Sequence, residues 1–280
     1  MRRFKIQNAN GATYDLTVNN REFMYGVRGL GYSDEVEYRR IANIYKRLSD
    51  YKAQGKIEGT IHFFGNEKPH KRYFDLVQFL QVKPLTLVYT PEDINVTYYR
   101  SGTVTDVDFD ETNPLSASIT FTCTTLWYER FSAITRPDSE LVNGKIYNYT
   151  YNYTYRNSIA NTVTIDVLGY ELSPVKLSLF GKLVNPEWTQ YINGKEVASG
   201  KVNYTIPSGY KLQVDTTDLP YSIKMYDSND NFIIDLYSYS DFGTERFLTL
   251  QNGINTISVN DDEGNKVVIK AEALLSYASV

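Results

Sequence analysis

The chain has 280 residues, of which 42% are hydrophobic, and it contains 25 Tyr, 13 Phe and one Cys at a formal net charge of −4. This length predicts two domains, and the aromatic content predicts a folded, β-rich protein. The mildly acidic charge argues against a general nucleic-acid or anionic-membrane binder, and one cysteine excludes an internal disulfide. With no long apolar window and no apolar segment near Met1, we expect neither a membrane span nor a standard export signal.

The first half of the chain combines strand patterns with one helix pattern. Apolar residues recur at helical spacing over residues 71–82 and stop before Pro84, which makes this the strongest helix signal in the chain. Asn10-Gly11 is a two-residue turn signal between two alternating segments. The expected elements are a hairpin over residues 3–18, a strand over 57–64, the helix over 71–82, a strand over 85–89 and a hairpin over 96–109.

Residues 33–54 are open to two interpretations. Acidic residues come first, six apolar residues from Val36 to Tyr51 lie roughly on one helical face, and Gly55 follows, which is typical of a helix. The alternation that would indicate strands is weaker. Local propensity alone therefore favours a helix here.

Residues 118–130 contain the clearest strand of the first half. Ile119 and Phe121 alternate with threonines, which predicts a half-buried core strand. Turn signals follow at residues 136–138 and 142–145. We place a domain boundary near them, with an N-terminal domain over residues 1–130 and a C-terminal domain over 131–280.

The second half is almost wholly β. Tyrosines at every second position from Tyr147 to Tyr155 alternate with Asn and Thr, a period of two that only a strand explains. Ten further strand segments are separated by turn signals such as Asn193-Gly194, which predicts a β-sandwich. The fold class is therefore mainly β, with one helix in the N-terminal domain. The ten segments cover residues 162–167, 175–180, 189–192, 197–206, 211–215, 222–226, 232–237, 246–250, 256–259 and 266–271.

Few residues suit catalysis or metal binding. His62 and His70 have no Cys or His partner at metal-ligand spacing, which favours a structural or solvated role over a zinc site. Cys123 shares a strand face with apolar residues, which favours burial over a nucleophilic role. The sequence has no nucleophile elbow, phosphate-binding loop or dinucleotide fingerprint.

Acidic clusters are the alternative basis for chemistry. A glycosidase needs two facing carboxylates, but the alternating Asp106, Asp108 and Asp110 and the consecutive acids over 261–263 are more typical of solvated edges and turns. Residues 227–231 have the alternating oxygens of a calcium loop but lack its glycine and its final glutamate, so a hairpin turn is favoured. The sequence predicts no catalytic, cofactor-binding or metal-binding residue.

The tyrosine row over residues 147–155 has two interpretations. Tyrosines on a strand face can stack on sugar rings, or they can form a core or a subunit interface, and we favour packing or an interface. Asn-x-Thr sequons would matter only in a eukaryotic secretory protein. They lie at Asn95, Asn148, Asn152 and Asn203.

The order of several short motifs resembles that of a known family. Four runs look like the N-terminal domain of the distal tail proteins of siphophages that infect Gram-positive bacteria: residues 73–80 (Tyr-Phe-Asp-Leu-Val-Gln-Phe-Leu), 84–89 (Pro-Leu-Thr-Leu-Val-Tyr), 98–100 (Tyr-Tyr-Arg) and 119–128, which ends in Leu-Trp-Tyr. Four further runs are similar to the galectin-like domain of the same family: residues 185–188 (Asn-Pro-Glu-Trp), 192–195, 209–216 and 250–257. Together the runs cover nearly the whole chain.

The resemblance implies a structural virion protein and not an enzyme, without a cofactor. Distal tail proteins form a hexameric ring through an N-terminal belt module, and the ring joins the tail tube to the tail-tip or baseplate proteins. The implied partners are further copies of the chain, the tail tube protein, a tail-tip or tail-associated lysin protein and receptor-binding proteins, with no nucleic acid and no membrane. The implied location is the distal end of the tail in the virion, after synthesis in the bacterial host cytoplasm.

The resemblance also bears on two open points. It implies that residues 36–59 form an extended belt hairpin, against the helix that propensity favours. The sugar-binding pattern of true galectins is absent, so we expect a structural role for Trp188. A module that binds cell-wall polysaccharide is the alternative function, and a wall-degrading glycosidase is the third.

Overall fold

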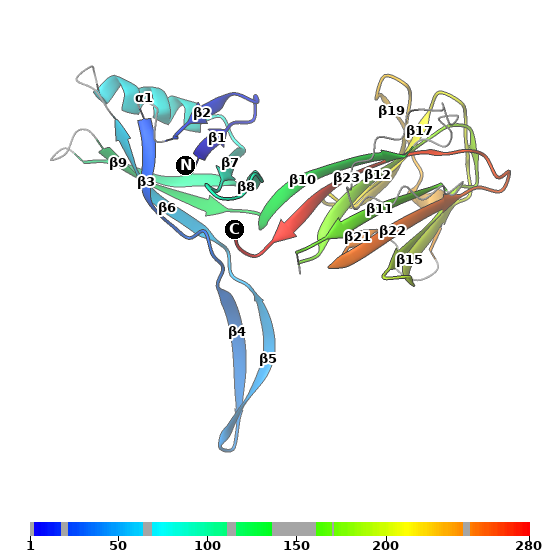
Figure 1. The fold of residues 1–280 in the computed structure, drawn as a ribbon, viewed down its shortest axis with the longest axis horizontal. Helices are drawn as coiled ribbons and strands as arrows, with labels where there is room; N and C mark the ends of the chain where they lie inside the picture. Colours follow the sequence, from blue (N-terminus) through cyan, green and yellow to red (C-terminus); the bar gives the residue numbers. More distant parts are fainter. Residues whose placement is uncertain are drawn as a thin grey trace, which may run out of the picture. The chain divides into compact units, whose positions relative to one another are not determined.

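A computed structural model describes residues 3–17, 22–63, 69–110, 116–135, 161–169, 171–242 and 247–280. The chain divides into two compact units, with Met1–Glu129 and Ser276–Val280 in unit 1 and Arg130–Leu275 in unit 2. Strands dominate both units, and the only α-helix among the described residues lies in unit 1 (Figure 1). The predicted mainly β fold is confirmed.

Unit 1 is an antiparallel sheet with the strand order β2-β1-β7-β8-β9-β6-β3, and α1 packs on one face of it (Figure 1). A separate pair, β4 and β5, leaves the sheet between β3 and β6. The bounds are β1 Arg3–Gln7, β2 Thr13–Asp15, β3 Glu22–Arg28, β4 Asp34–Ile41, β5 Ile44–Lys52, β6 Lys56–Phe63, α1 Pro69–Leu80, β7 Leu85–Thr90, β8 Tyr98–Phe109 and β9 Ser116–Cys123.

The core of unit 1 follows from the alternation in its strands. Ile119 and Phe121 of β9 are 2% exposed, and they meet Leu76 and Leu80, the buried residues of α1. Burying an aliphatic or aromatic side chain of this size contributes about 1.5–3 kcal/mol. The hairpin about Asn10-Gly11, the strand before α1 and the helix itself are confirmed.

The hairpin predicted over residues 96–109 is wrong. This stretch is one strand, β8, which pairs with β7 on one side and with β9 on the other. Gly102, opposite Cys123, marks close packing and not a turn, because a Cβ there would overlap the Thr122 carbonyl oxygen and the Phe121 ring. Glycine in a strand has this use where a neighbour approaches closely.

The helix favoured by propensity over residues 33–54 is also wrong. The segment is the antiparallel pair β4–β5, as the family resemblance implied. Glu37 pairs with Ser49 and Tyr38 with Arg47, so Leu48 is an extra, bulged residue. The bulge shifts the alternation of the second strand, and the apolar residues then fall at spacings of four and three that resemble a helix.

Unit 2 contains two antiparallel sheets, each with alternating buried residues, which is the arrangement of a β-sandwich (Figure 1). One sheet has the order β10-β23-β12-β17-β18-β19, and the other has the order β11-β22-β14-β15-β20. Each of the ten predicted segments overlaps a strand, but residues 197–206 contain parts of two strands, β15 and β16, and the described part of 246–250 forms a strand only at Thr249 and Leu250. The bounds are β10 Trp127–Thr135, β11 Thr162–Val167, β12 Ser173–Phe180, β13 Leu183–Val184, β14 Glu187–Ile192, β15 Lys195–Val202, β16 Thr205–Ile206, β17 Lys211–Asp215, β18 Ser222–Tyr226, β19 Phe232–Asp235, β20 Ser240–Phe242, β21 Thr249–Leu250, β22 Gly253–Asn260 and β23 Val268–Tyr277.

Three predicted features fall outside the described residues. They are the tyrosine row over 147–155, with the sequons Asn148 and Asn152, and the turn signals over 136–138 and 142–145. The predicted division at residue 130, with its separate roles for the two domains, stays a prediction.

Candidate assembly surfaces

The β4–β5 hairpin, which we call the arm, is a two-stranded ribbon that extends from the sheet of unit 1 (Figure 1). Among the described residues its strands pair only with each other, and nearly every side chain along them is exposed. An isolated two-stranded hairpin is marginally stable in water. An exposed ribbon of this length is therefore typical of a segment that gains stability from a partner.

The base of the arm has matched polar partners across its two strands. Lys52 Nζ lies 2.7 Å from Asp34 Oδ1, and the Tyr51 hydroxyl donates to Glu35 at 2.6 Å, a bond that raises the pKa of Tyr51. Opposite charges and hydrogen-bonding groups that face each other across two strands stabilise a ribbon. Each of these four side chains at the base therefore has a partner within the arm.

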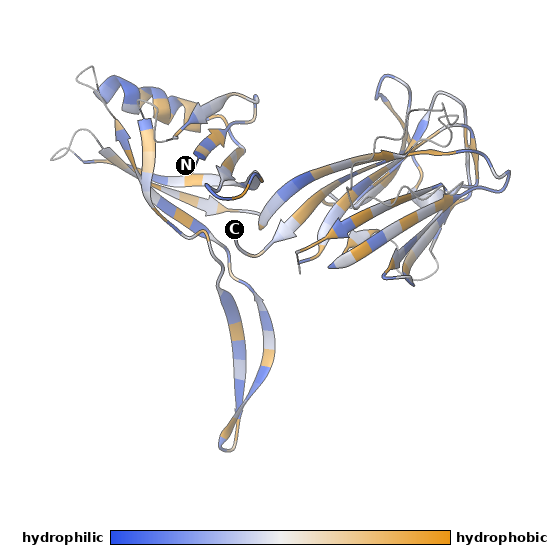
Figure 2. Cartoon of the chain, viewed as in Figure 1, coloured by the Kyte–Doolittle hydropathy of each residue, from blue (hydrophilic) through white to orange (hydrophobic). Residues whose placement is uncertain are grey.

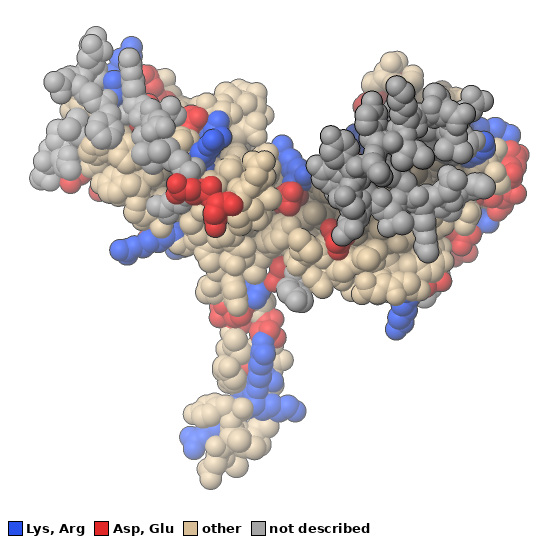
Figure 3. Space-filling model, in the orientation of Figure 1, with Lys and Arg blue, Asp and Glu red and all other residues tan. Residues whose placement is uncertain are grey.

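The tip of the arm is different in composition and in pairing. Residues 38–47 contain four basic residues and no acid, and basic side chains lie beyond the acidic ones along the arm (Figure 3). Arg39 pairs directly with Lys46, and like charges opposite each other destabilise a ribbon. The next pair toward the turn is Arg40 with Tyr45, and the pair after it is Ile41 with Ile44, which are 51% and 72% exposed. Figure 2 shows hydrophobic residues at this end of the arm.

A groove lies on unit 1 between α1 and β8. Its volume is about 230 Å³, with Tyr73, Val77 and Leu80 of α1 on one side and residues 104–107 of β8 on the other. The Tyr73 hydroxyl donates to the Val107 carbonyl at 3.4 Å and closes one end of the groove. Gln81 and Lys83 complete the lining.

The groove follows an edge of β8 that no other described strand pairs with. The register of β7 with β8 ends at Leu85 and Gly102, so residues 103–109 pair only with β9 among the described strands. Asp106 lines the groove, Asp108 follows, and both are exposed. Neither has an ion-pair partner within the part of the chain that the structure describes. The predicted solvated acidic edge is confirmed for these two residues.

The histidines and the cysteine take structural positions. The His62 ring packs 5.6 Å from Phe23, and the His70 ring lies 5.1 Å from Phe109. Cys123 is 2% exposed, and burial raises the pKa of its thiol, against the opposing effect of Arg100. These positions agree with the favoured interpretation of each residue.

Arg100, which the sequence marked only as part of the 98–100 motif, is buried. It is 3% exposed, its Nε donates to the Thr125 carbonyl at 3.0 Å, and its guanidinium lies 5.4 Å from the centre of the Trp127 ring. Burial lowers the pKa of the guanidinium. Charged residues are rarely buried, so residue type alone did not predict this position. A related feature of the sequence is Gly55, because a Cβ at that residue would overlap the Arg100 guanidinium.

The other predicted acids lie in turns of unit 2. Asp227 accepts bonds from the backbone N–H groups of Asn229 and Asn231 and closes the β18–β19 hairpin. Asp262 pairs with Lys201 at 2.9 Å, and Glu263 pairs with Lys182 at 2.8 Å. These acids stabilise turns. Among the described residues, no three His, Cys, Asp or Glu side chains form a group that could hold a metal ion.

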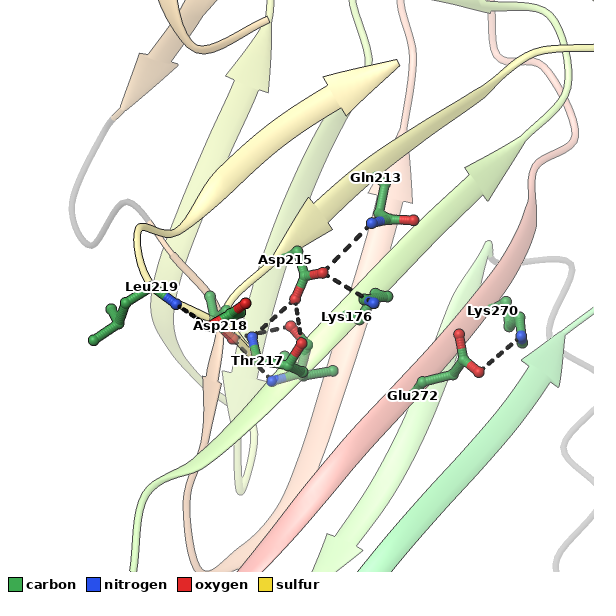
Figure 4. Close-up of polar contacts among 10 residues, drawn as sticks. Lys176, Gln213, Asp215, Thr217, Asp218, Leu219, Lys270 and Glu272 are labelled. Atoms are coloured by element: carbon green, nitrogen blue, oxygen red, sulfur yellow. Dashed lines mark hydrogen bonds and ion pairs between the residues drawn. The ribbon is translucent and has the colours of Figure 1, made fainter. Parts of the chain in front are cut away.

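A polar hollow of about 270 Å³ lies on unit 2 beside Asp215, Tyr221 and Tyr226. Asp215 accepts bonds from the Thr217 backbone N–H at 2.8 Å and hydroxyl at 2.6 Å and pairs with Lys176 at 3.1 Å (Figure 4). Burial raises the pKa of Asp215, but these partners outweigh burial and hold the pKa below its usual value. Because the carboxylate is already saturated, we assign no sugar site to the hollow. Trp188 is fully buried in the same unit.

A β-rich chain with an exposed arm and an unpaired strand edge has the features of a structural assembly component. Residues 3–124 match the family model described as the N-terminal domain of distal tail proteins. Over residues 3–124 the chain therefore matches the distal tail family, and the resemblance that the motif order predicted is confirmed there. No curated protein matches the chain. No helix among the described residues has the length and apolar character to cross a bilayer.

Solved structures of phage tail components share the fold. A chain of the phage P2 baseplate, in its activated conformation with Ca, is 19% identical, with a TM-score of 0.62 and coverage of 100% of both chains. The Dit protein of SPP1, described as a paradigm of the hub adsorption apparatus in phages that infect Gram-positive bacteria, is 15% identical. Its TM-score is 0.62, with coverage of 96% of this chain and 98% of that chain. At these identities the likeness establishes a common fold.

Proposed function

We propose that the chain is the ring-forming hub at the distal end of a siphophage tail. Six copies assemble through unit 1, and the ring joins the tail tube above it to the tail-tip or baseplate proteins below it. The observation that carries this proposal is the fold similarity over the whole chain to the P2 baseplate component and the SPP1 hub protein.

The surfaces of unit 1 support assembly by head-to-tail contacts. A ring of identical copies needs two different complementary surfaces on each copy, because each contact is heterologous. The arm and the α1–β8 groove are two such surfaces on one unit. Exposed strand edges and ribbons also supply backbone groups that a neighbouring chain can pair.

The role that we propose is structural and not catalytic. Cys123 is buried, and Asp227, Asp262 and Glu263 hold turns, so the residues considered for chemistry serve the fold. The proposed partners are the tail tube protein, a tail-tip or tail-associated lysin protein and receptor-binding proteins, in the virion. Unit 2 is the galectin-like domain in this scheme.

Light scattering on the purified chain tests the ring, with negative-stain images of the same peak. We expect a particle of about six times the chain mass of 32.2 kDa, with six-fold symmetry in the images. Co-sedimentation with assembled tail tubes then tests the junction. A chain that stays monomeric at high concentration and does not bind tubes would refute the proposal.

A further inference from the structure

We propose that the last residues of the chain, Ser276–Val280, are a strap that fastens the returning end of unit 2 to unit 1. Tyr277 is the side chain that closes the fastening. With the strap in place unit 2 is held at both of its ends, and without it unit 2 hangs on one anchored strand. The inference does not depend on the proposed ring.

The chain crosses between the two units twice. β10 carries it out of unit 1 after Glu129, and β23 returns it to unit 1 at Ser276. The two strands are neighbours in one sheet. The match to the family model ends at residue 124, so it includes neither crossing and not the strap. The contacts of the strap within unit 1 therefore decide whether the second crossing is anchored.

The strap packs against the hydrophobic core of unit 1. Tyr277 and Val280 are partly buried against that core, and Ser276 is 8% exposed. Chain ends are usually poorly ordered unless they are tied down. The strap has the buried contacts that tie down a chain end.

Tyr277 makes the directional contacts of the strap. Its hydroxyl donates to Glu129 Oε2 at 3.2 Å, and its ring meets the Tyr98 ring edge to face, with 5.5 Å between the ring centres. Burial and then the charge of Glu129 raise the pKa of Tyr277 to about 12, so the hydroxyl keeps its proton at neutral pH. A hydrogen bond to a carboxylate is stronger than one between two neutral groups.

Glu129 is the last residue of unit 1 before the first crossing, and its neighbours hold it in place. Trp127 is fully buried, and its indole N–H donates to a backbone carbonyl at 3.1 Å. Tyr128 pairs with Tyr99 of β8, and their rings stack with centres 5.7 Å apart. The bond from Tyr277 to Glu129 thus ties the returning strand to the point from which the outgoing strand leaves.

Distances between two spin labels on the full chain test the fastening. Gln78 on unit 1 and Lys195 on unit 2 are exposed, and Cys123 is buried, so Gln78→Cys with Lys195→Cys provides two selective labelling sites. Double electron–electron resonance should give one narrow distance distribution while Tyr277 is present. In Tyr277→Ala the distribution should be about twofold broader or more, because the crossing at β10 then acts as a hinge.

Hydrogen exchange of the strap amides, measured by mass spectrometry, gives a graded second readout. Exchange should be on the order of tenfold to a hundredfold faster in Tyr277→Ala, which loses the buried ring and the bond. It should be about two- to tenfold faster in Tyr277→Phe, which loses the hydroxyl alone. Glu129→Gln keeps an acceptor and should have a smaller effect. Tyr45→Ala is the control: it truncates a tyrosine of the arm that is 67% exposed, and it should change neither readout.

A distribution that is narrow in the unmodified chain and broad in Tyr277→Ala supports the strap. Distributions of equal width in the two chains overturn it, whether both are narrow or both are broad. If Tyr277→Ala does not fold, exchange in the conservative variants decides, and strap amides that exchange at the same rate in Tyr277→Phe as in the unmodified chain overturn the proposal. Ring formation in light scattering is a separate measurement, so failure of the strap leaves the proposed function standing.

Discussion

The Thr216 hydroxyl connects three segments of unit 2, and its removal should destabilise that unit. The residue is 3% exposed. Its Oγ1 accepts from the Val175 N–H at 2.8 Å and donates toward the carbonyls of Val175 and Leu248, each at 2.9 Å. Thr216→Val keeps the size of the side chain and leaves the Val175 N–H without a partner.

The magnitude follows from that orphaned donor. The Val175 carbonyl keeps the Thr216 backbone N–H at 3.1 Å, so the main loss is one buried N–H group. An unsatisfied buried donor costs about 1–3 kcal/mol. For a unit of this size, a loss of about 2 kcal/mol lowers Tm by roughly 4–8 °C. Differential scanning calorimetry of the full chain measures the shift.

Thr164→Val on β11 is the matched control. Thr164 is exposed, and its hydroxyl lies 3.5 Å from that of Thr256, so we expect a change within about 0.5 kcal/mol. If the stability change for Thr216→Val also stays within that range, the hydrogen bonds of the Thr216 hydroxyl do not stabilise unit 2 and the reasoning fails.

Three further predictions concern packing, pH and the arm. Gly102→Ala forces a Cβ against the Thr122 carbonyl and the Phe121 ring, which should lower the free energy of unfolding of unit 1 by about 1–3 kcal/mol in a urea titration. The control Gly31→Ala adds a Cβ that meets nothing within 4 Å, so the same titration should show almost no change. Folding lowers the pKa of Asp215 from 3.8. The ionised carboxylate therefore stabilises unit 2 above that pH, and this contribution is lost as the pH falls through the lowered pKa. In thermal melts below about pH 4, the Tm of Asp215→Asn should therefore fall less with decreasing pH than the Tm of the unmodified chain. Replacement of residues 34–52 by a short Gly-Ser linker should abolish rings in light scattering while the melting of unit 1 is unchanged, since among the described strands β4 and β5 pair only with each other. A cooperative loss of unit 1 would contradict this.

Strands with a buried face could be predicted from the sequence, because alternation records burial directly. The ten segments of unit 2 and the helix before Pro84 were found this way. The arm was not, because it has no buried face to impose a strict alternation, and its bulge at Leu48 moved the apolar residues to helical spacing. Only the family resemblance gave the correct structure there.

The groove could not be predicted from local patterns. Residues 73–83 and 104–107 are separated in the chain by β7 and the start of β8. Only the register of β7 with β8 shows that residues 103–109 have no strand on this side among the described residues. Asp106 and Asp108 were correctly placed on a solvated strand face. Their position at the rim of a groove is a property of the fold.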